Sequence, residues 1–212
     1  MDIKLGIVMD PIGSIKVHKD SSFAMLLAAQ KRGWNLFYME QNDLFLDDSR
    51  CHATMQKLAV RDEARDWYSL SEKRTAAVDE LDVVLMRKDP PMNMEFLYSS
   101  FLLERAEAHG TLVVNSPAAI RNVSEKLYTA WFSQCCPPTR VSRDAVRLKE
   151  FLAEHGDIIV KPLDGMGGAS VFRIQENDPN LNVILETITG NGDTSAMAQR
   201  YIPEITEGDK RI

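Results

Sequence analysis

The chain has 212 residues, 44% hydrophobic and 26% charged, which is typical of a globular protein with enough apolar material to form a core. Its 25 basic and 31 acidic residues give a net charge of −6, which argues against nucleic acid or an anionic membrane as the main partner. The three cysteines lack metal-ligand spacing, and no run resembles a signal peptide or a membrane span. We therefore expect a soluble, cytoplasmic chain without a disulfide scaffold or a structural zinc site.

The first half of the chain alternates between short apolar runs and segments with helical spacing. The apolar runs predict buried strands at Ile3 to Met9, Asn35 to Met39, Leu81 to Met86 and Thr111 to Asn115. Helices are predicted from an N-cap at Asp20 or Ser21 to Gln30, and from about Met94 to His109, each closed by a glycine. The less regular stretch between them contains Cys51 to Val60, which favours a hairpin. Strands that alternate with helices predict a parallel α/β sheet.

The pattern changes near residue 120. Helices are expected at Ser124 to Phe132, Asp144 to Gly156 and Asn182 to Ile188, and strands at Asp157 to Leu163, Ser170 to Ile174 and Ser195 to Ile202. Cys135 to Thr139 contains two consecutive prolines and predicts a rigid connection. This order predicts an α+β module. The chain ends on Ile212, like the opening residue of a strand, so we expect further protein after it.

The strongest chemical signal is the run Val160 to Ser170, whose three glycines allow positive φ angles and leave backbone N–H groups bare. Such a loop suits phosphate oxygens, although it fits neither the Walker pattern nor the dinucleotide fingerprint because a strand follows it. A flexible hairpin turn explains the glycines equally well. Lys161 favours the anion-binding interpretation, since a lysine in an apolar strand is costly to desolvate without an anion.

A second signal is the segment Met86 to Pro91, which contains Arg87 and Lys88 directly after a predicted strand. Ligands of open α/β sheets lie beyond the carboxyl ends of strands, and arginine can hold a carboxylate with two parallel hydrogen bonds. A solvated turn with a local Lys–Asp pair is equally compatible with this segment. Asp10-Pro11 and Asn115-Ser116-Pro117 close their strands similarly, so three strand ends can line one crevice.

Three further residues, one lysine and two adjacent cysteines, carry little information about function by themselves. Lys126 lies on the first turns of a predicted helix, where a lysine is usually a solvated surface residue. Cys135 and Cys136 are most simply small buried residues rather than nucleophiles.

Four segments closely resemble the bacterial glutathione synthetases, an ATP-grasp family: Leu5 to Pro11, Arg87 to Pro91, Glu125 to Leu127 and Lys161 to Gly168. The likeness runs from Lys4 to Ile212, and the last segment is the most specific. It implies an N-terminal α/β substrate domain over residues 1–122 and an α+β ATP-grasp lid domain over 123–202. Residues 203–212 would begin a C-terminal ATP-grasp domain that this sequence largely lacks.

The resemblance implies ATP-dependent joining of γ-glutamylcysteine to glycine through an acyl phosphate, giving glutathione, ADP and phosphate. It implies that Lys126 and Lys161 hold the ATP phosphates, and that Arg87 and Asn115 hold γ-glutamylcysteine. A flap over the phosphates would be formed by Gly165, Met166, Gly167, Gly168 and Ala169. The adenine edge would meet the backbone of a strand formed by Gln199, Arg200, Tyr201 and Ile202, with Asp209 near the ribose.

The resemblance also implies Mg²⁺ bound by acidic and asparagine side chains of the C-terminal domain, and a homotetramer. We therefore expect no metal ligands among the 212 residues, and no glutathione formation by these residues alone. Two alternatives remain. One is another ATP-grasp carboxylate–amine ligase, for instance one that adds glutamate to a protein, and the other is a non-catalytic nucleotide-binding module.

Overall fold

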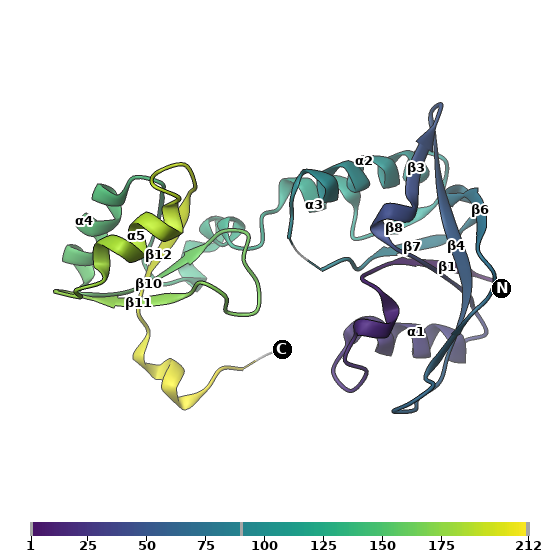
Figure 1. Cartoon of the computed structure of the whole chain (residues 1–212), viewed down its shortest axis with the longest axis horizontal. Helices are drawn as coiled ribbons and strands as arrows, with labels where there is room; N and C mark the ends of the chain where they lie inside the picture. The colour runs from purple at the N-terminus through teal and green to yellow at the C-terminus, as the bar shows by residue number, and fades with distance from the viewer. Residues whose placement is uncertain (1, 90, 211–212) are drawn as a thin grey trace. The chain divides into compact units, whose positions relative to one another are not determined.

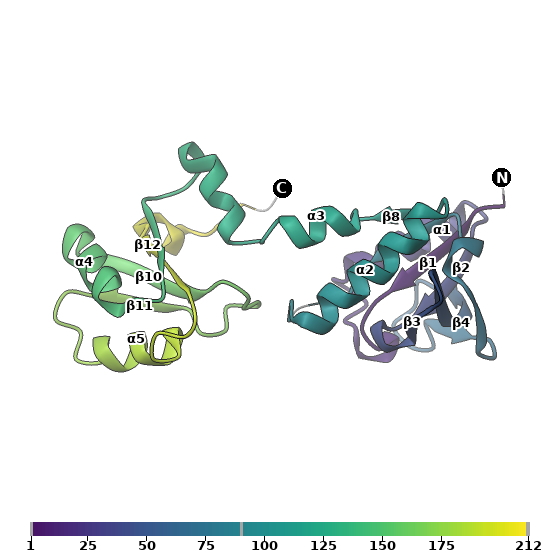
Figure 2. The same cartoon turned by 90° about the horizontal axis from the view of Figure 1, so that it is seen from above.

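The computed structural model describes residues 2–89 and 91–210, and the chain divides into two compact units, residues 1–122 and 123–212. In the first unit, helices cover both faces of a sheet (Figures 1 and 2). Four strands pair in parallel in the order β2-β1-β7-β8: β1 (Lys4–Val8), β2 (Asn35–Met39), β7 (Val83–Met86) and β8 (Leu112–Val114). The predicted parallel core is thereby confirmed.

An antiparallel extension makes this sheet mixed. Strand β4 (Arg50–Val60) pairs with β2 and also with β3 (Leu44–Asp47), β5 (Tyr68–Leu70) and β6 (Arg74–Ala77). The predicted hairpin within Cys51 to Val60 is wrong, because these residues form one continuous strand. Its buried face changes along the strand: Cys51, Ala53 and Met55 pack in the core against α2, whereas Leu58 and Val60 pack in the core against α1. The hairpin partner is β3, which precedes it, with Asp48 at φ 50° in the connecting turn.

The helices of the first unit are α1 (Ser21–Lys31), α2 (Met94–Ala108) and the short α3 (Pro117–Asn122), which the sequence pattern did not predict. Of the two candidate N-caps for α1, Asp20 is the one used, since its carboxylate accepts from the Phe23 N–H at 2.8 Å. Strand β1 alternates between two cores: Leu5 and Ile7 pack with α1, whereas Val8 packs with α2.

The second unit is an antiparallel sheet in the order β11-β10-β12-β9, with two helices on one face (Figure 1). Its strands are β9 (Thr139–Ser142), β10 (Asp157–Pro162), β11 (Phe172–Gln175) and β12 (Ala196–Arg200). The covering helices are α4 (Ala145–His155) and α5 (Leu181–Thr189). The predicted α+β arrangement is confirmed.

Three local predictions in the second unit are wrong. The helix expected from Ser124 to Phe132 is a 3₁₀ helix, Leu127–Cys135, which is broken at Phe132 by a non-helical backbone angle. Thr139, expected in a rigid connection, begins β9, a short strand whose order depends on pairing with β12. The last strand ends at Arg200, two residues earlier than expected.

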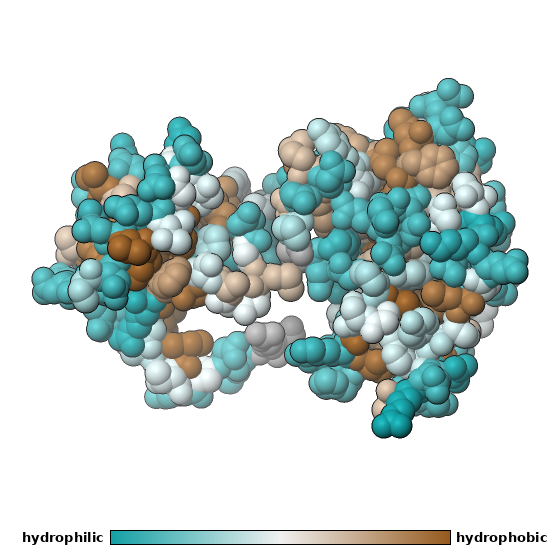
Figure 3. Space-filling view, in the orientation of Figure 1, coloured by the Kyte–Doolittle hydropathy of each residue, from teal (hydrophilic) through white to brown (hydrophobic). Residues whose placement is uncertain are grey.

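The remaining 3₁₀ helices are Ile12–Ser14, Gln41–Asp43, Val78–Glu80 and Pro203–Glu207. Across the described residues, no helix combines the length and apolar character needed to cross a membrane. Figure 3 shows the apolar residues on one face as separate brown groups among teal polar ones. This pattern fits a chain whose large apolar side chains lie mostly inside its cores.

Candidate functional site

The second sheet has an outer face, which we define as the face opposite α4 and α5. Val160 on β10 and Ala198 on β12 point into the core beneath these helices. Because side chains alternate along a strand, their neighbours Lys161 and Met197 belong to the outer face. The register places Val141 of β9 in the same row. Lys161, which the sequence analysis placed in an apolar strand, therefore lies on the outer face of the sheet and not in the core beneath α4 and α5.

One lysine contacts the glycine-rich loop of this unit, and a second lysine, at the end of β10, interacts with the first. The Lys126 ammonium donates to the Gly165 carbonyl oxygen and lies 3.6 Å from the Glu125 carboxylate. Burial lowers the pKa of Lys161, and the positive charge of Lys126 lowers it further. Among the described residues, no carboxylate forms an ion pair with Lys161. A polyanion bound between the two ammonium groups would stabilise their charged forms and raise the pKa of Lys161 again.

The loop itself surrounds a cavity of about 190 Å³, lined by Lys126, Gly165, Gly167 and neighbouring residues. Gly167 and Gly168 adopt φ angles of 65° and 78°, which L side chains rarely adopt. Gly165 is needed for a different reason, because a Cβ there would lie 2.8 Å from Pro162 Cγ. The predicted positive φ angles thus occur at two of the three glycines, and close approach to Pro162 accounts for the third.

A hydrogen-bonding edge is left open where β12 ends. The Arg200 N–H donates to the Pro138 carbonyl at 3.0 Å, so the Arg200 carbonyl points toward the same neighbour. Pro138 has no N–H to offer in return. The next N–H on that side of the chain belongs to Ile202, and within the described residues it has no hydrogen-bond acceptor. One acceptor and one donor therefore lie on the same side of the chain, and neither has a hydrogen-bond partner among residues 2–89 and 91–210.

This strand end lines one cavity, and its neighbour Pro138 lines another. One, of about 500 Å³, is lined by Pro138, Thr139 and Val141 together with the 3₁₀ helix Leu127–Cys135. The other, of about 350 Å³, is lined by Arg200 to Glu204 with His155 and Asp157. Of the other residues predicted here, Gln199 donates its side-chain amide to Thr139 Oγ1 at 3.0 Å, and Asp209 lies exposed after the last 3₁₀ helix.

In the first unit, the three strand ends predicted to line one crevice belong to neighbouring strands, β1, β7 and β8. Lys88 is paired with Asp10, its ammonium lying 2.8 Å from the carboxylate, so it supplies no free cation. The exposed Arg87 guanidinium donates to Ser21 Oγ at 2.9 Å and to Ser22 Oγ at 3.1 Å. No carboxylate pairs with Arg87 in the described part of the chain.

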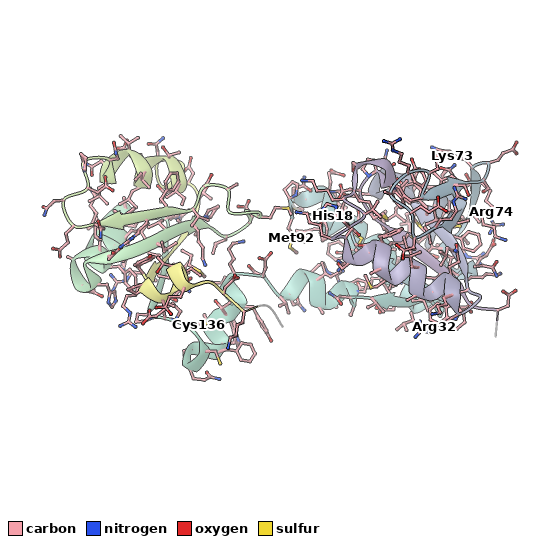
Figure 4. The ribbon with its side chains drawn as sticks, turned by 90° about the horizontal axis from the view of Figure 1, so that it is seen from below. His18, Arg32, Lys73, Arg74, Met92 and Cys136 are labelled. Atoms are coloured by element: carbon pink, nitrogen blue, oxygen red, sulfur yellow. The ribbon has the colours of Figure 1, made fainter. Side chains whose placement is uncertain are left out.

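The serines that orient Arg87 were not predicted, because they lie about 65 positions earlier in the sequence. Asn115 is exposed just beyond β8. In Figure 4, His18 and Met92, which precede α1 and α2, lie at one end of this unit, and Arg74 lies at the other.

The cysteines fall into different environments. Cys51 is buried, and burial raises the pKa of its thiol to about 12. Cys136, labelled in Figure 4, is half-buried and lines the cavity of about 500 Å³. The prediction that both cysteines of the adjacent pair are buried is wrong for Cys135, which is exposed. Over residues 2–89 and 91–210, no three His, Cys, Asp or Glu side chains gather as a metal site would require.

Comparison with solved structures shows the class of fold. The chain resembles an ATP-grasp protein of the RimK-domain type from Sphaerobacter thermophilus with a TM-score of 0.59 and 18% identity, over 94% of this chain and 64% of that one. At this identity the likeness shows the fold, which is that of the ATP-grasp proteins.

Within that class, the chain belongs to the prokaryotic glutathione synthetase family. Residues 3–121 match the family model for the N-terminal domain and residues 125–212 that for the ATP-grasp domain. Glutathione synthetases of Vibrio vulnificus (strain YJ016) and Pseudomonas aeruginosa are 55% and 57% identical over 212 residues, all of this chain. The chain spans 67% of each relative, about two thirds of its length. The resemblance drawn from the sequence motifs is thereby confirmed.

Proposed function

We propose that the protein joins γ-glutamylcysteine to glycine at the expense of ATP, through an acyl phosphate, to give glutathione, ADP and phosphate. The observation that carries the proposal is Lys161, a partly desolvated cation beside Lys126 and a glycine-rich loop, without a carboxylate partner in the described residues. Membership of the glutathione synthetase family supports the identity of the substrates.

ATP would lie over the outer face of the second sheet, with its phosphates between Lys126 and Lys161 and beneath the loop Gly165 to Ala169. Phosphoryl transfer depends mainly on positioning and on neutralising charge, which two ammonium groups and bare N–H groups provide. The acyl phosphate must be kept from water, and a loop that closes over it would do this.

The adenine base would meet the open edge at the end of β12. Adenine presents an amino donor beside a ring-nitrogen acceptor, which matches the Arg200 carbonyl and the Ile202 N–H. Gln199 and Tyr201 complete this segment, and Asp209 would lie near the ribose. The described residues hold no cluster of side chains that would fit Mg²⁺, and the family resemblance implies that its ligands lie in the C-terminal domain.

Arg87 and Asn115 would hold γ-glutamylcysteine in the first unit. Replacing Arg87 with alanine should raise the KM for γ-glutamylcysteine by about tenfold or more, because charge-assisted hydrogen bonds to a carboxylate are lost. The KM for ATP should stay within about twofold. Steady-state kinetics with each substrate varied in turn checks this expectation.

Arg74→Ala is a suitable control, since Arg74 pairs with Glu80 on the surface of the same unit. It should leave both KM values unchanged. An Arg87→Ala variant impaired only toward ATP would remove Arg87 from the dipeptide site.

The proposed function is tested by phosphate release from the full-length protein with different acceptor pairs. We expect release only with ATP, γ-glutamylcysteine and glycine together, with glutathione formed in equal amount. Release with another carboxylate–amine pair, such as glutamate and a protein, would favour a different ATP-grasp ligase. Nucleotide binding without turnover of any pair would favour a binding module. We also propose that the protein is cytoplasmic and that it forms a homotetramer, the latter because the family resemblance implies it.

A further inference from the structure

A polar network on the outer face holds the chain at the end of β12. Arg173 on β11 donates Nε to Asp157 Oδ1 at 3.0 Å and Nη2 to Oδ2 at 2.6 Å. Gln175 donates to Asp157 Oδ2 at 3.0 Å. The Arg173 hydrogen bond, helped by Gln175, lowers the pKa of Asp157 and keeps this carboxylate charged. Arg173 is thereby fixed in one orientation by a paired carboxylate.

That orientation places Arg173 against Tyr201. The guanidinium carbon of Arg173 lies 3.7 Å from the centroid of the Tyr201 ring, well within cation–π range. The Tyr201 N–H donates to the Asp157 carbonyl at 3.0 Å. Tyr201 is therefore held both by its backbone and by its ring, and both restraints come from the β10–β11 pair.

Tyr201 is also the residue between the two unpartnered groups, the Arg200 carbonyl and the Ile202 N–H. Rotation about its φ and ψ angles would change the spacing and direction of these two groups relative to each other. A hydrogen-bonding edge recognises a base only when its donor and acceptor are held in register, because misplaced groups lose both bonds.

We propose that Arg173 is a positioning residue, which acts through Tyr201 to hold the Arg200 carbonyl and the Ile202 N–H in register for an adenine base and against a guanine base. The proposal rests on the proposed function, since it requires ATP to bind at this strand end. Guanine presents an acceptor and a donor in the reverse order, so a rigid edge leaves both of its groups unpaired.

A stability role explains this network less well. The Arg173 side chain is 47% exposed, and exposed ion pairs contribute little to the free energy of unfolding. The same unit contains a matched network at Arg140, which donates to the Glu154 carboxylate at 2.9 and 3.1 Å and lies 5.1 Å from the Phe151 ring. Arg140 lies on the helix side of the sheet, so its removal tests for the loss of a surface network alone.

The experiment compares Arg173→Ala with Arg140→Ala in the full-length enzyme. For Arg173→Ala we expect the KM for ATP to rise about tenfold and kcat to stay within about twofold, because base binding contributes equally to ground and transition states. The preference for ATP over GTP, measured as the ratio of kcat/KM values, should fall by about tenfold or more. Arg140→Ala should leave KM and preference unchanged, and Arg173→Lys should lie between Arg173→Ala and the wild type.

A second variant removes the ring rather than the charge. Tyr201→Leu should reproduce the effect of Arg173→Ala, because the Arg173 guanidinium contacts the Tyr201 ring. This variant carries the test if Arg173→Ala does not fold, which thermal unfolding would reveal.

Equal base preference in Arg173→Ala, Tyr201→Leu and the wild type would overturn the proposal, as would a loss of kcat without a change in preference. These outcomes differ from failure of the proposed function, in which the wild type itself would form no glutathione from ATP.

Discussion

Lys161→Met should lower the kcat of ATP turnover by about 100-fold or more while the fold stays intact. The substitution keeps a long apolar side chain on the outer face but removes the cation beside Lys126. Charge that develops on the transferred phosphoryl group would then lack one of its two ammonium partners. Phosphate-release kinetics on the full-length protein measures the loss. Lys149→Met is a matched control, because Lys149 is exposed on α4 of the same unit.

The same substitution should leave the protein at least as stable as the wild type. Burial and the charge of Lys126 lower the pKa of Lys161 below its ordinary value of 10.5. Between the folded and unfolded pKa values the unfolded chain binds more protons, so the lysine's destabilising effect weakens as pH rises through this window. The gain in Tm from Lys161→Met should therefore be largest near pH 7 and shrink toward pH 10. Wild-type turnover in Lys161→Met would make Lys161 a structural residue.

Gly6→Val should destabilise the first unit by about 3 kcal/mol, enough to lower its Tm by roughly 10 °C or more. A Cβ at Gly6 would lie 2.6 Å from Leu81 Cδ1 and 2.9 Å from Met39 Cε, both fully buried in the core that packs against α2. Those two atoms end flexible side chains and can yield to one methyl group. The extra methyl groups of valine have no room because Val84 also lies within 3.3 Å of that Cβ.

Thermal unfolding followed by circular dichroism measures this effect, with Gly6→Ala as the control. Alanine should cost much less than valine. An equal Tm for Gly6→Val and the wild type would mean that the sheet and its helices move apart more easily than their packing indicates.

Sequence patterns predicted the elements whose signals are local. The apolar runs of β1, β2, β7 and β8 and the caps of α1 and α4 depend on neighbouring residues, and their existence and type are confirmed. Strand β9 could not be predicted, because four mixed residues give no period and pairing with β12 orders them. The mixed character of the first sheet likewise depends on where β4 pairs.

The candidate site likewise contains residues that a local sequence signal identifies and residues that only tertiary contacts bring to it. Lys161 stood out because its apolar strand is a local signal. Lys126 did not stand out without the family resemblance, since its contact with Gly165 joins positions 39 residues apart. The pairing of Arg87 with Ser21 and Ser22 is a tertiary contact of the same kind. Local composition can therefore identify a loop or a strand, but not which distant side chains will meet it.

Pro138 affects the end of β12 because proline has no backbone N–H. Its missing N–H leaves the Arg200 carbonyl without that hydrogen bond, so a ligand that bound at this strand end would meet main-chain groups. Substitution of the side chains at positions 200 and 202 would then leave this pattern of backbone donor and acceptor unchanged. The residue that leaves this edge open, Pro138, lies just before β9, far earlier in the chain than the strand end itself.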